Sequence, residues 1–183
     1  DDFPLDGTEH LDTDGDGIGN NADDDDDNDG VNDNLDFYPL DSSKSVFKGQ
    51  KALIIAGGGP YKSIYLWDAT KNMANYAYEA LKFQGLSDDD IYYLSEEDKE
   101  IVDGTVSLAA IEQAVLTLAG DGSEDVTDVL IYMVDHGGDQ VFKLDETTFL
   151  KAADLRSWLD KLQSQSSLKT IVIYDACESG SFI

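Results

Sequence analysis

The chain has 183 residues, and its formal net charge of −27 comes from 39 acidic against 12 basic side chains. Such an acidic protein repels phosphate groups, which argues against a nucleic acid or an anionic membrane surface as its partner. No apolar run approaches the ~18 residues of a transmembrane helix, so we expect no membrane span in this chain.

The acidic residues divide the chain into two unequal parts. Residues 1–41 contain 16 of the acidic side chains and no lysine or arginine, so this part lacks the composition for a core. Residues 42–183, about 140 in number, are enough to bury one. We therefore expect a small irregular segment at 1–41 and a folded domain at 42–183. The chain opens inside the acidic pattern without a signal peptide, so we expect a fragment of a longer precursor.

The acidic segment repeats one pattern with an offset of thirteen residues. In each copy, Asp or Asn occupies positions 1, 3, 5, 9 and 12 of a loop, with glycine at position 6 for the sharp turn and a backbone carbonyl offered at position 7. This is the spacing by which one calcium ion gathers oxygen ligands from a tightly wound loop. The expected ligands are Asp12, Asp14, Asp16, Ile18, Asn20 and Asp23 in the first loop, and Asp25, Asp27, Asp29, Val31, Asp33 and Asp36 in the second.

Neither loop is flanked by the apolar helices of an EF-hand, and the doubled D-x-D-x-D-G pattern resembles thrombospondin type 3 repeats instead. Residues 3–6 and 37–41 look like one recurring unit, so we expect a longer array upstream. We expect structural calcium and a secreted or cell-surface location, extracellular or periplasmic. The alternative is a disordered acidic linker.

Residues 42–183 alternate apolar strands with amphipathic helices. Strands are expected at 51–56, 91–94, 129–134 and 170–174, with a small hairpin arm at 141–144. Helices are expected from Leu66 to a stop at Gly85, from a cap at Ser107 to a stop at Gly120, and over 155–162. This alternation predicts an α/β fold with a mostly parallel sheet and helices on both faces, in three layers. Active sites of such sheets lie beyond the carboxyl ends of the strands.

A lone cysteine and a histidine follow two of the expected strands. Cys177 is the only cysteine in the chain, and His136 is the only histidine outside the acidic segment. A free thiol is mostly protonated at neutral pH, so a nucleophilic cysteine needs a base beside it, which a histidine can supply. Attack on a carbonyl creates an oxyanion, which the backbone N–H groups of Gly137 and Cys177 can stabilise. Each residue alone is more often structural, but their joint placement favours catalysis.

The stretches D-H-G-G at 135–138 and D-A-C-E-S-G-S at 175–181 resemble the legumain-like cysteine peptidases, relatives of caspases and metacaspases. The resemblance covers about residues 51–183 and implies a caspase-like sheet, with Cys177 as nucleophile, His136 as general base and no cofactor for catalysis. The cysteine stretch differs from the caspase signature Q-A-C-[RQG]-G, which argues against caspase-type specificity. Legumains carry a further catalytic residue where this chain has residues 61–65, and no counterpart is obvious there.

Asp175 precedes the nucleophile by the offset at which legumains and metacaspases carry an acidic pocket residue. A carboxylate there binds a basic side chain at P1, the substrate residue before the cleaved bond, by charge, or an amide by hydrogen bonding. We expect Arg or Lys first and Asn second; the alternative is that Asp175 only accepts backbone hydrogen bonds. Asp135 is expected to be structural, because adjacent strand residues point to opposite faces and it cannot easily orient His136.

The sequence therefore favours a cysteine endopeptidase that acts on a peptide or protein substrate and is tethered to calcium-binding repeats. Two alternatives stay open: a transpeptidase that uses the same two residues, and a non-catalytic calcium-binding adhesive or scaffold protein. The strand at 170–174 is the last of four, and the chain stops at Ile183. We therefore expect an incomplete catalytic domain, with a second chain or a C-terminal continuation packed beside that strand.

Overall fold

The computed structural model describes residues 1–34, 36, 38–43, 49–60, 66–97, 99–118, 126–165 and 168–182. Four sequence features lie outside these residues: Phe37 of the recurring unit, residues 61–65, the predicted helix stop at Gly120, and Ile183. The internal contacts divide the chain into two compact units, Asp1–Lys48 and Gly49–Ile183. Within the described residues, no helix combines the length and the apolar character that crossing a bilayer requires.

The described residues of the first unit form turns, bends and irregular segments, without a helix or a strand. Its two loops place glycine at the same point of the pattern, Gly17 with a φ of 95° and Gly30 with a φ of 96°. This is the left-handed region, which residues with a Cβ rarely adopt, so the glycines allow each chain segment to turn back on itself.

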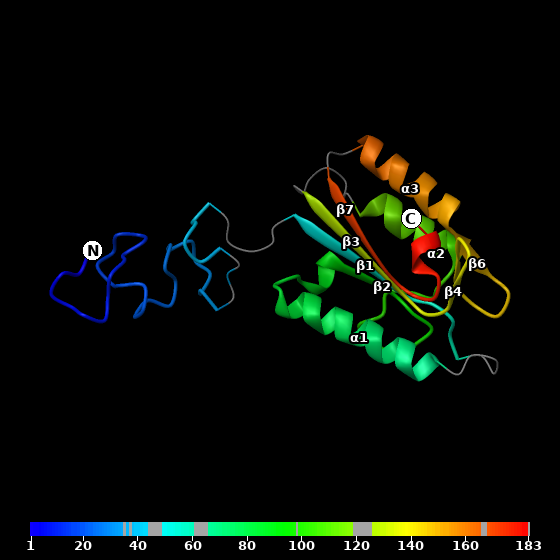
Figure 1. The fold of residues 1–183 in the computed structure, drawn as a ribbon, viewed down its shortest axis with the longest axis horizontal. Helices are drawn as coiled ribbons and strands as arrows, with labels where there is room; N and C mark the ends of the chain where they lie inside the picture. Colours follow the sequence, from blue (N-terminus) through cyan, green and yellow to red (C-terminus); the bar gives the residue numbers. More distant parts are fainter. Residues whose placement is uncertain are drawn as a thin grey trace. The chain divides into compact units, whose positions relative to one another are not determined.

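The second unit is built around a parallel sheet of four strands in the order β2-β1-β3-β7 (Figure 1). The strands are β1 Gln50–Ala56, β2 Ile91–Leu94, β3 Asp128–Val134 and β7 Lys169–Asp175. Residues 52–56 of the central strand β1 are fully buried, as its continuous apolar sequence predicts for a strand covered on both faces. Because all pairings are parallel, the carboxyl ends of the strands share one edge of the sheet.

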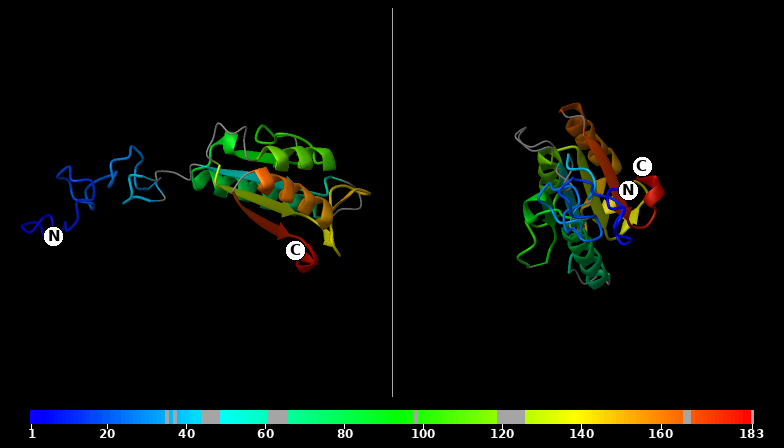
Figure 2. Two further views of the ribbon diagram at one scale, coloured as in Figure 1. Left: turned by 90° about the horizontal axis from the view of Figure 1, so that it is seen from above. Right: turned by 90° about the vertical axis from the view of Figure 1, so that its left-hand side faces the viewer.

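Helices cover both faces of this sheet (Figures 1 and 2). Helix α1 (Trp67–Phe83) packs on one face through a core that includes Ala74 and Tyr78. Helices α2 (Leu108–Thr117) and α3 (Ala152–Gln165) pack on the other face, with Ile111 and Trp158 in its core. The predicted mixed α/β class with a mostly parallel sheet between helices is confirmed, and it is consistent with a caspase-like fold.

The predicted helix boundaries at Gly85 and Ser107 are confirmed by local hydrogen bonds. After α1, Gly85 adopts a φ of 98°, and the N–H of Leu86 donates to the carbonyl of Leu81 at 3.1 Å. This closes the helix with a glycine in the left-handed region. Before α2, the Ser107 hydroxyl accepts the N–H of Ala110 at 3.1 Å and satisfies a donor that has no partner within the helix.

A small antiparallel sheet in the order β4-β5-β6 follows β3. Its strands are β4 Gly137–Gly138, β5 Val141–Lys143 and β6 Phe149–Lys151. The hairpin arm predicted at 141–144 corresponds to β5, whereas the short strand β6 was not predicted. Phe142 on β5 is fully buried against the α2 and α3 side of the core, which anchors the small sheet to the large one.

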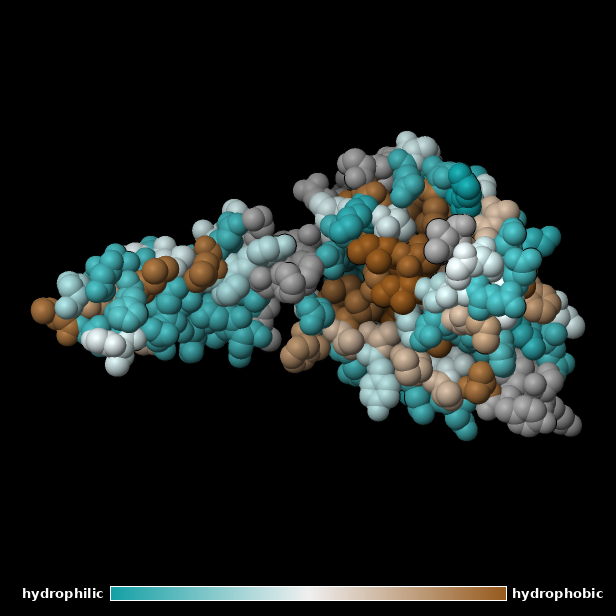
Figure 3. Space-filling model, in the orientation of Figure 1, coloured by the Kyte–Doolittle hydropathy of each residue, from teal (hydrophilic) through white to brown (hydrophobic). Residues whose placement is uncertain are grey.

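Strand β7 is the outer strand of the parallel sheet (Figure 2, left). Ile171, Val172 and Ile173 are 40%, 39% and 46% exposed, and Figure 3 shows apolar residues gathered over this strand. Among the described residues, no strand pairs with its outer side. Strand β7 therefore lies at an edge of the sheet within the described residues.

Candidate active site and candidate calcium loops

His136 and Cys177 follow two neighbouring strands of the parallel sheet. Strands β3 and β7 pair in register up to Val134 and Asp175, and each of the two candidate residues lies two positions further along its own chain segment. Both therefore emerge at the carboxyl edge of the sheet, where α/β proteins place their ligands. His136 is half-buried, and the free thiol of Cys177 is exposed.

The histidine and cysteine segments meet at Gly137. A Cβ at this position would overlap with the carbonyl oxygen of Cys177 and with the hydroxyl of Tyr174, so only glycine fits between the two segments. The N–H of Lys143 donates to the carbonyl of His136 at 2.9 Å, so this carbonyl points to β5. The N–H of Gly137 belongs to the same trans peptide group and therefore points away from β5.

Ser181 ties the segment after Cys177 to the segment after His136. Its hydroxyl accepts the N–H of Gln140 at 2.9 Å, and its own proton can go to the carbonyl of Glu178 at 2.8 Å or of Gly138 at 3.3 Å. This serine was not among the predicted site residues, although it ends the A-C-E-S-G-S stretch. Its hydrogen bonds hold the two segments in a common position.

Asp175 is exposed at the end of β7 and has a side-chain partner. Its Oδ2 accepts a hydrogen bond from the buried Tyr132 hydroxyl on β3 at 3.0 Å. Burial, followed by the contact with the Asp175 carboxylate, raises the pKa of Tyr132 above its usual range, so the phenol stays protonated and donates. Tyr132 lies inside an apolar run, and nothing in its spacing identified it as a partner of Asp175.

Asp135 lies against the glycine loop after β1. It is 8% exposed, neither carboxylate oxygen has a hydrogen-bond partner, and a Cβ on Gly58 would overlap with this carboxylate. Burial raises the pKa of Asp135, while the nearby backbone N–H of His136, the charges of His136 and Lys143, and the Thr70 side chain act in the opposite direction. A buried carboxylate without hydrogen bonds is costly when ionised, so burial favours the protonated, neutral form of Asp135.

The region from α2 to the end of the chain resembles a known peptidase family. Residues 109–183 match the model of the Peptidase C13 family. The match covers less than half of the chain and includes β3, the small sheet, β7, His136 and Cys177. It supports a legumain-like cysteine peptidase domain with a peptide substrate. No curated protein matches the chain at a significant level.

The two acidic loops of the first unit share the hydrogen bonds made at positions 5, 6 and 7. At position 6, the N–H of Gly17 donates to Asp12 at 3.1 Å, and that of Gly30 donates to Asp25 at 3.0 Å. The bonds from positions 5 and 7 are also repeated: Asp16 to Asp14 at 3.0 Å, Asp29 to Asp27 at 3.2 Å, Ile18 to Asp16 at 2.8 Å and Val31 to Asp29 at 2.9 Å. Each of these carboxylates thus uses one oxygen to hold the backbone, except Asp12, whose other oxygen also accepts the N–H of Gly15 at 2.8 Å.

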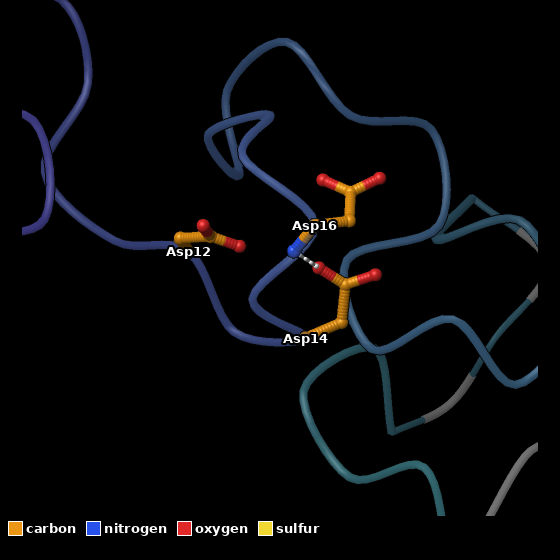
Figure 4. Close-up of side chains that lie close together, drawn as sticks. All are labelled: Asp12, Asp14 and Asp16. Carbon is orange, nitrogen blue, oxygen red and sulfur yellow. Dashed lines mark hydrogen bonds between the residues drawn. The ribbon is translucent and has the colours of Figure 1, made fainter.

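Three carboxylates converge in each loop. Oxygens of Asp12, Asp14 and Asp16 lie within 4.8 Å of one another (Figure 4), and the same holds for Asp25, Asp27 and Asp29. In the second loop the remaining oxygens are buried without a hydrogen-bond partner, namely Asp25 Oδ1, Asp27 Oδ2 and Asp29 Oδ2, together with Asp36 Oδ2. Buried carboxylate oxygens that lack a donor fit a hard divalent cation such as calcium.

The other expected side-chain ligands have backbone partners. At position 9, Asn20 accepts the N–H of Thr13 at 3.1 Å, and Asp33 accepts that of Asp26 at 2.9 Å. At position 12, Asp23 and Asp36 lie outside the two clusters, and each accepts an N–H two residues further along, from Asp25 at 3.0 Å and from Tyr38 at 2.8 Å.

Asp26 is a buried carboxylate that the ligand pattern does not include. It is 9% exposed, and its Oδ1 has no hydrogen-bond partner. Burial, followed by the charge of Asp33, raises its pKa. Position 2 of the loop carries no ligand in the pattern, so the spacing could not identify this residue.

Proposed function

We propose that the second unit is a cysteine endopeptidase with Cys177 as the nucleophile and His136 as the general base. The observation that carries this proposal is the meeting of the two segments at Gly137, within the region that matches the peptidase family. His136 takes the thiol proton, the sulfur bonds to the scissile carbonyl carbon, and the C=O electron pair moves to the oxygen. The C–N bond then breaks, the imidazolium protonates the leaving amine, and water hydrolyses the thioester.

The proposed oxyanion donors are the backbone N–H groups of Gly137 and Cys177. The direction of the Gly137 N–H, away from β5, supports this role, because a donor used by the ladder could not serve an oxyanion. The thiolate, the imidazole and the backbone donors supply every step of this mechanism, so we propose no cofactor for catalysis.

For the substrate, we propose Arg or Lys at P1, bound by Asp175. The carboxylate is exposed, and Tyr132 holds one of its oxygens, which supports a fixed negative charge that can meet a guanidinium or ammonium group. Asn at P1 is the second choice, since its amide can donate a hydrogen bond to the same carboxylate.

We further propose that another strand, from a second chain or a C-terminal continuation, pairs with β7. The support is the exposed apolar run Ile171, Val172 and Ile173 on an outer strand. Unpaired backbone groups beside exposed apolar side chains favour the addition of a strand.

For the first unit, we propose two structural calcium ions in loops like those of thrombospondin type 3 repeats. One ion would lie among Asp12, Asp14, Asp16, Asn20, Asp23 and the carbonyl of Ile18, and the other among Asp25, Asp27, Asp29, Asp33, Asp36 and the carbonyl of Val31. The converging carboxylates support both sites. Calcium loops of this kind suit a secreted or cell-surface protein, where calcium is abundant.

The experiment that tests the catalytic proposal is labelling with acyloxymethyl ketone probes that carry Arg, Lys, Asn or Asp at P1. We expect Cys177 to be labelled, and peptide hydrolysis to fall by roughly 10³-fold or more in Cys177→Ala and in His136→Ala. The double variant should be little worse than either single one, because the two residues act as a unit. His10→Ala, which changes the other histidine of the chain, is the matched control and should keep full activity.

The same experiment separates the alternatives. Substantial turnover by folded Cys177→Ala would remove the nucleophile assignment. Folded protein that no probe labels would favour the non-catalytic adhesive or scaffold protein. Added peptide amines that are joined to the acyl group in place of water would identify a transpeptidase, because an amine resolves a thioester by the same attack.

A further inference from the structure

The two calcium loops of the first unit differ in how their carboxylates are buried. We infer that the second loop, residues 25–36, binds calcium first and more tightly than the first loop, residues 12–23. This inference rests on the proposed calcium binding and adds an order of filling, which the ligand pattern alone does not contain.

The backbones of the two loops are alike at positions 5, 6 and 7. The position-6 glycines have φ values of 95° and 96°, and their N–H groups donate to the position-1 carboxylates at 3.1 and 3.0 Å. The bonds from positions 5 and 7 recur within 0.2 Å between the loops. The loops differ at position 4. The N–H of Gly15 donates to Asp12 Oδ1 at 2.8 Å, whereas the N–H of Asn28 donates to the backbone carbonyl of Asp25 at 3.1 Å and leaves Asp25 Oδ1 without a partner. The difference to explain is therefore how far each carboxylate is buried and bonded.

The carboxylates of the second loop are already withdrawn from water. Asp27 at position 3 is 6% exposed, whereas its counterpart Asp14 is only half-buried, and Asp16 at position 5 is exposed. Four pattern oxygens of the second loop are buried without a partner, while residues 12–23, all of which the structure describes, contain none. A cation that meets such oxygens does not have to strip them of water, and it removes the cost of their burial.

The second loop also carries one more charged ligand. Position 9 is Asn20 in the first loop and Asp33 in the second, so the pattern supplies four carboxylates in one and five in the other. Calcium affinity rises with the number of ligand charges and with the rigidity of the site. Burial and charge therefore act in the same direction, and both favour residues 25–36.

The test is a calcium titration of the full chain followed by NMR at the amides of Gly17 and Gly30. Each amide donates to the position-1 carboxylate of its own loop, so its resonance reports that loop alone. We expect the Gly30 signal to change with the first equivalent of calcium and the Gly17 signal with the second. Calorimetry should give two dissociation constants that differ by about tenfold or more.

Matched variants show which loop gives the tight and which gives the weak phase of calcium binding in calorimetry. Asp27→Asn and Asp14→Asn change the same position of each loop, and we expect them to remove the tight and the weak phase respectively. The reciprocal pair Asn20→Asp and Asp33→Asn exchanges the charge at position 9 and should narrow the gap in affinity from both sides.

Several outcomes would count against the inference. A Gly17 signal that changes first, or two signals that change together, would overturn the order of filling while leaving calcium binding in place. Loss of the tight phase in Asp14→Asn would do the same. No calcium uptake by the unmodified chain would overturn the calcium proposal itself. The NMR arm needs no substitution, so a variant that fails to fold leaves the order of filling testable.

Discussion

At the scale of single residues, Asp135 has a buried carboxylate and directly precedes the proposed general base His136. Its carboxylate lies against Gly58 without a hydrogen-bond partner, and burial raises its pKa. The folded protein therefore holds the Asp135 proton more tightly than the unfolded chain does. Stability contributed by the neutral acid is present at low pH and is lost as pH rises through the folded-state pKa.

We predict that Asp135→Asn stabilises the second unit at pH 7 by roughly 1–3 kcal/mol, because it removes a buried charge that lacks a partner. The gain should vanish below pH 3.8, the ordinary pKa of the side chain, where the wild-type acid is neutral in both states. Thermal unfolding between pH 3 and pH 8 measures this. The exposed neighbour Asp139 supplies the control Asp139→Asn, for which we expect no such trend. A variant less stable than wild type at pH 7 would contradict the prediction.

We predict that Asp175→Ala lowers kcat/KM for substrates with Arg or Lys at P1 by about 10- to 100-fold, a loss of about 1.4–2.7 kcal/mol in transition-state binding. Alkylation of Cys177 by iodoacetamide should be unchanged, because Asp175 binds the side chain and does not form the thiolate. Tyr132→Phe, which removes only the hydrogen bond to this carboxylate, should have a smaller effect. An unchanged P1 preference in Asp175→Ala would place the pocket elsewhere.

At the scale of elements, the outer strand β7 leads to the candidate nucleophile at its carboxyl end and exposes apolar side chains in its middle. Its carboxyl end leads to Cys177, and its middle exposes three consecutive apolar residues. A flat apolar strand with an unpaired side invites association with another strand. The same strand therefore links the candidate active site to the proposed partner.

We predict that Ile173→Lys reduces self-association of the isolated chain, because a lysine on an outer strand opposes edge-to-edge pairing. Ile173 is 46% exposed, so the substitution should cost only about 0.5 kcal/mol of stability. Light scattering against protein concentration measures the effect. Ile131→Lys, on the neighbouring strand β3 but fully buried, is the contrasting variant and should unfold the unit. Equal association of Ile173→Lys and wild type would argue against β7 as the contact.

At the scale of the whole molecule, each of the two units is stabilised by a different kind of interaction. The second unit has an apolar core on each face of its sheet. The described part of the first unit relies on carboxylates that accept backbone N–H groups, and its clustered negative charges repel one another. A cation that offsets this repulsion should therefore matter far more to the first unit than to the second.

We predict that chelation of calcium loosens residues 12–36 and leaves the second unit folded. At a calcium concentration 100 times Kd, each ion stabilises its loop by about 2.7 kcal/mol, which chelation removes. Hydrogen exchange resolved along the chain, with and without EGTA, measures the change, and addition of magnesium in place of calcium is the control. Equal loss of protection in both units would show that calcium also supports the second one.

The sequence by itself determined the features that depend on neighbours along the chain. The thirteen-residue repeat was predicted because its hydrogen bonds join residues two to seven positions apart, as between Gly30 and Asp25 or between Asp26 and Asp33. The helix boundaries at Gly85 and Ser107 were predicted for the same reason. The alternation of strands and helices was sufficient for the fold class, because each element must bury its apolar face.

Only the tertiary structure decided which distant residues meet. The contact of Asp135 with Gly58, the bond from Tyr132 to Asp175 and the clamp of Ser181 on Gly138 join positions about 40 or more residues apart. No local spacing encodes such contacts, because they form only when parallel strands from distant segments come into register. The different burial of two loops with one shared pattern was likewise invisible in the sequence, since it depends on what packs around each carboxylate.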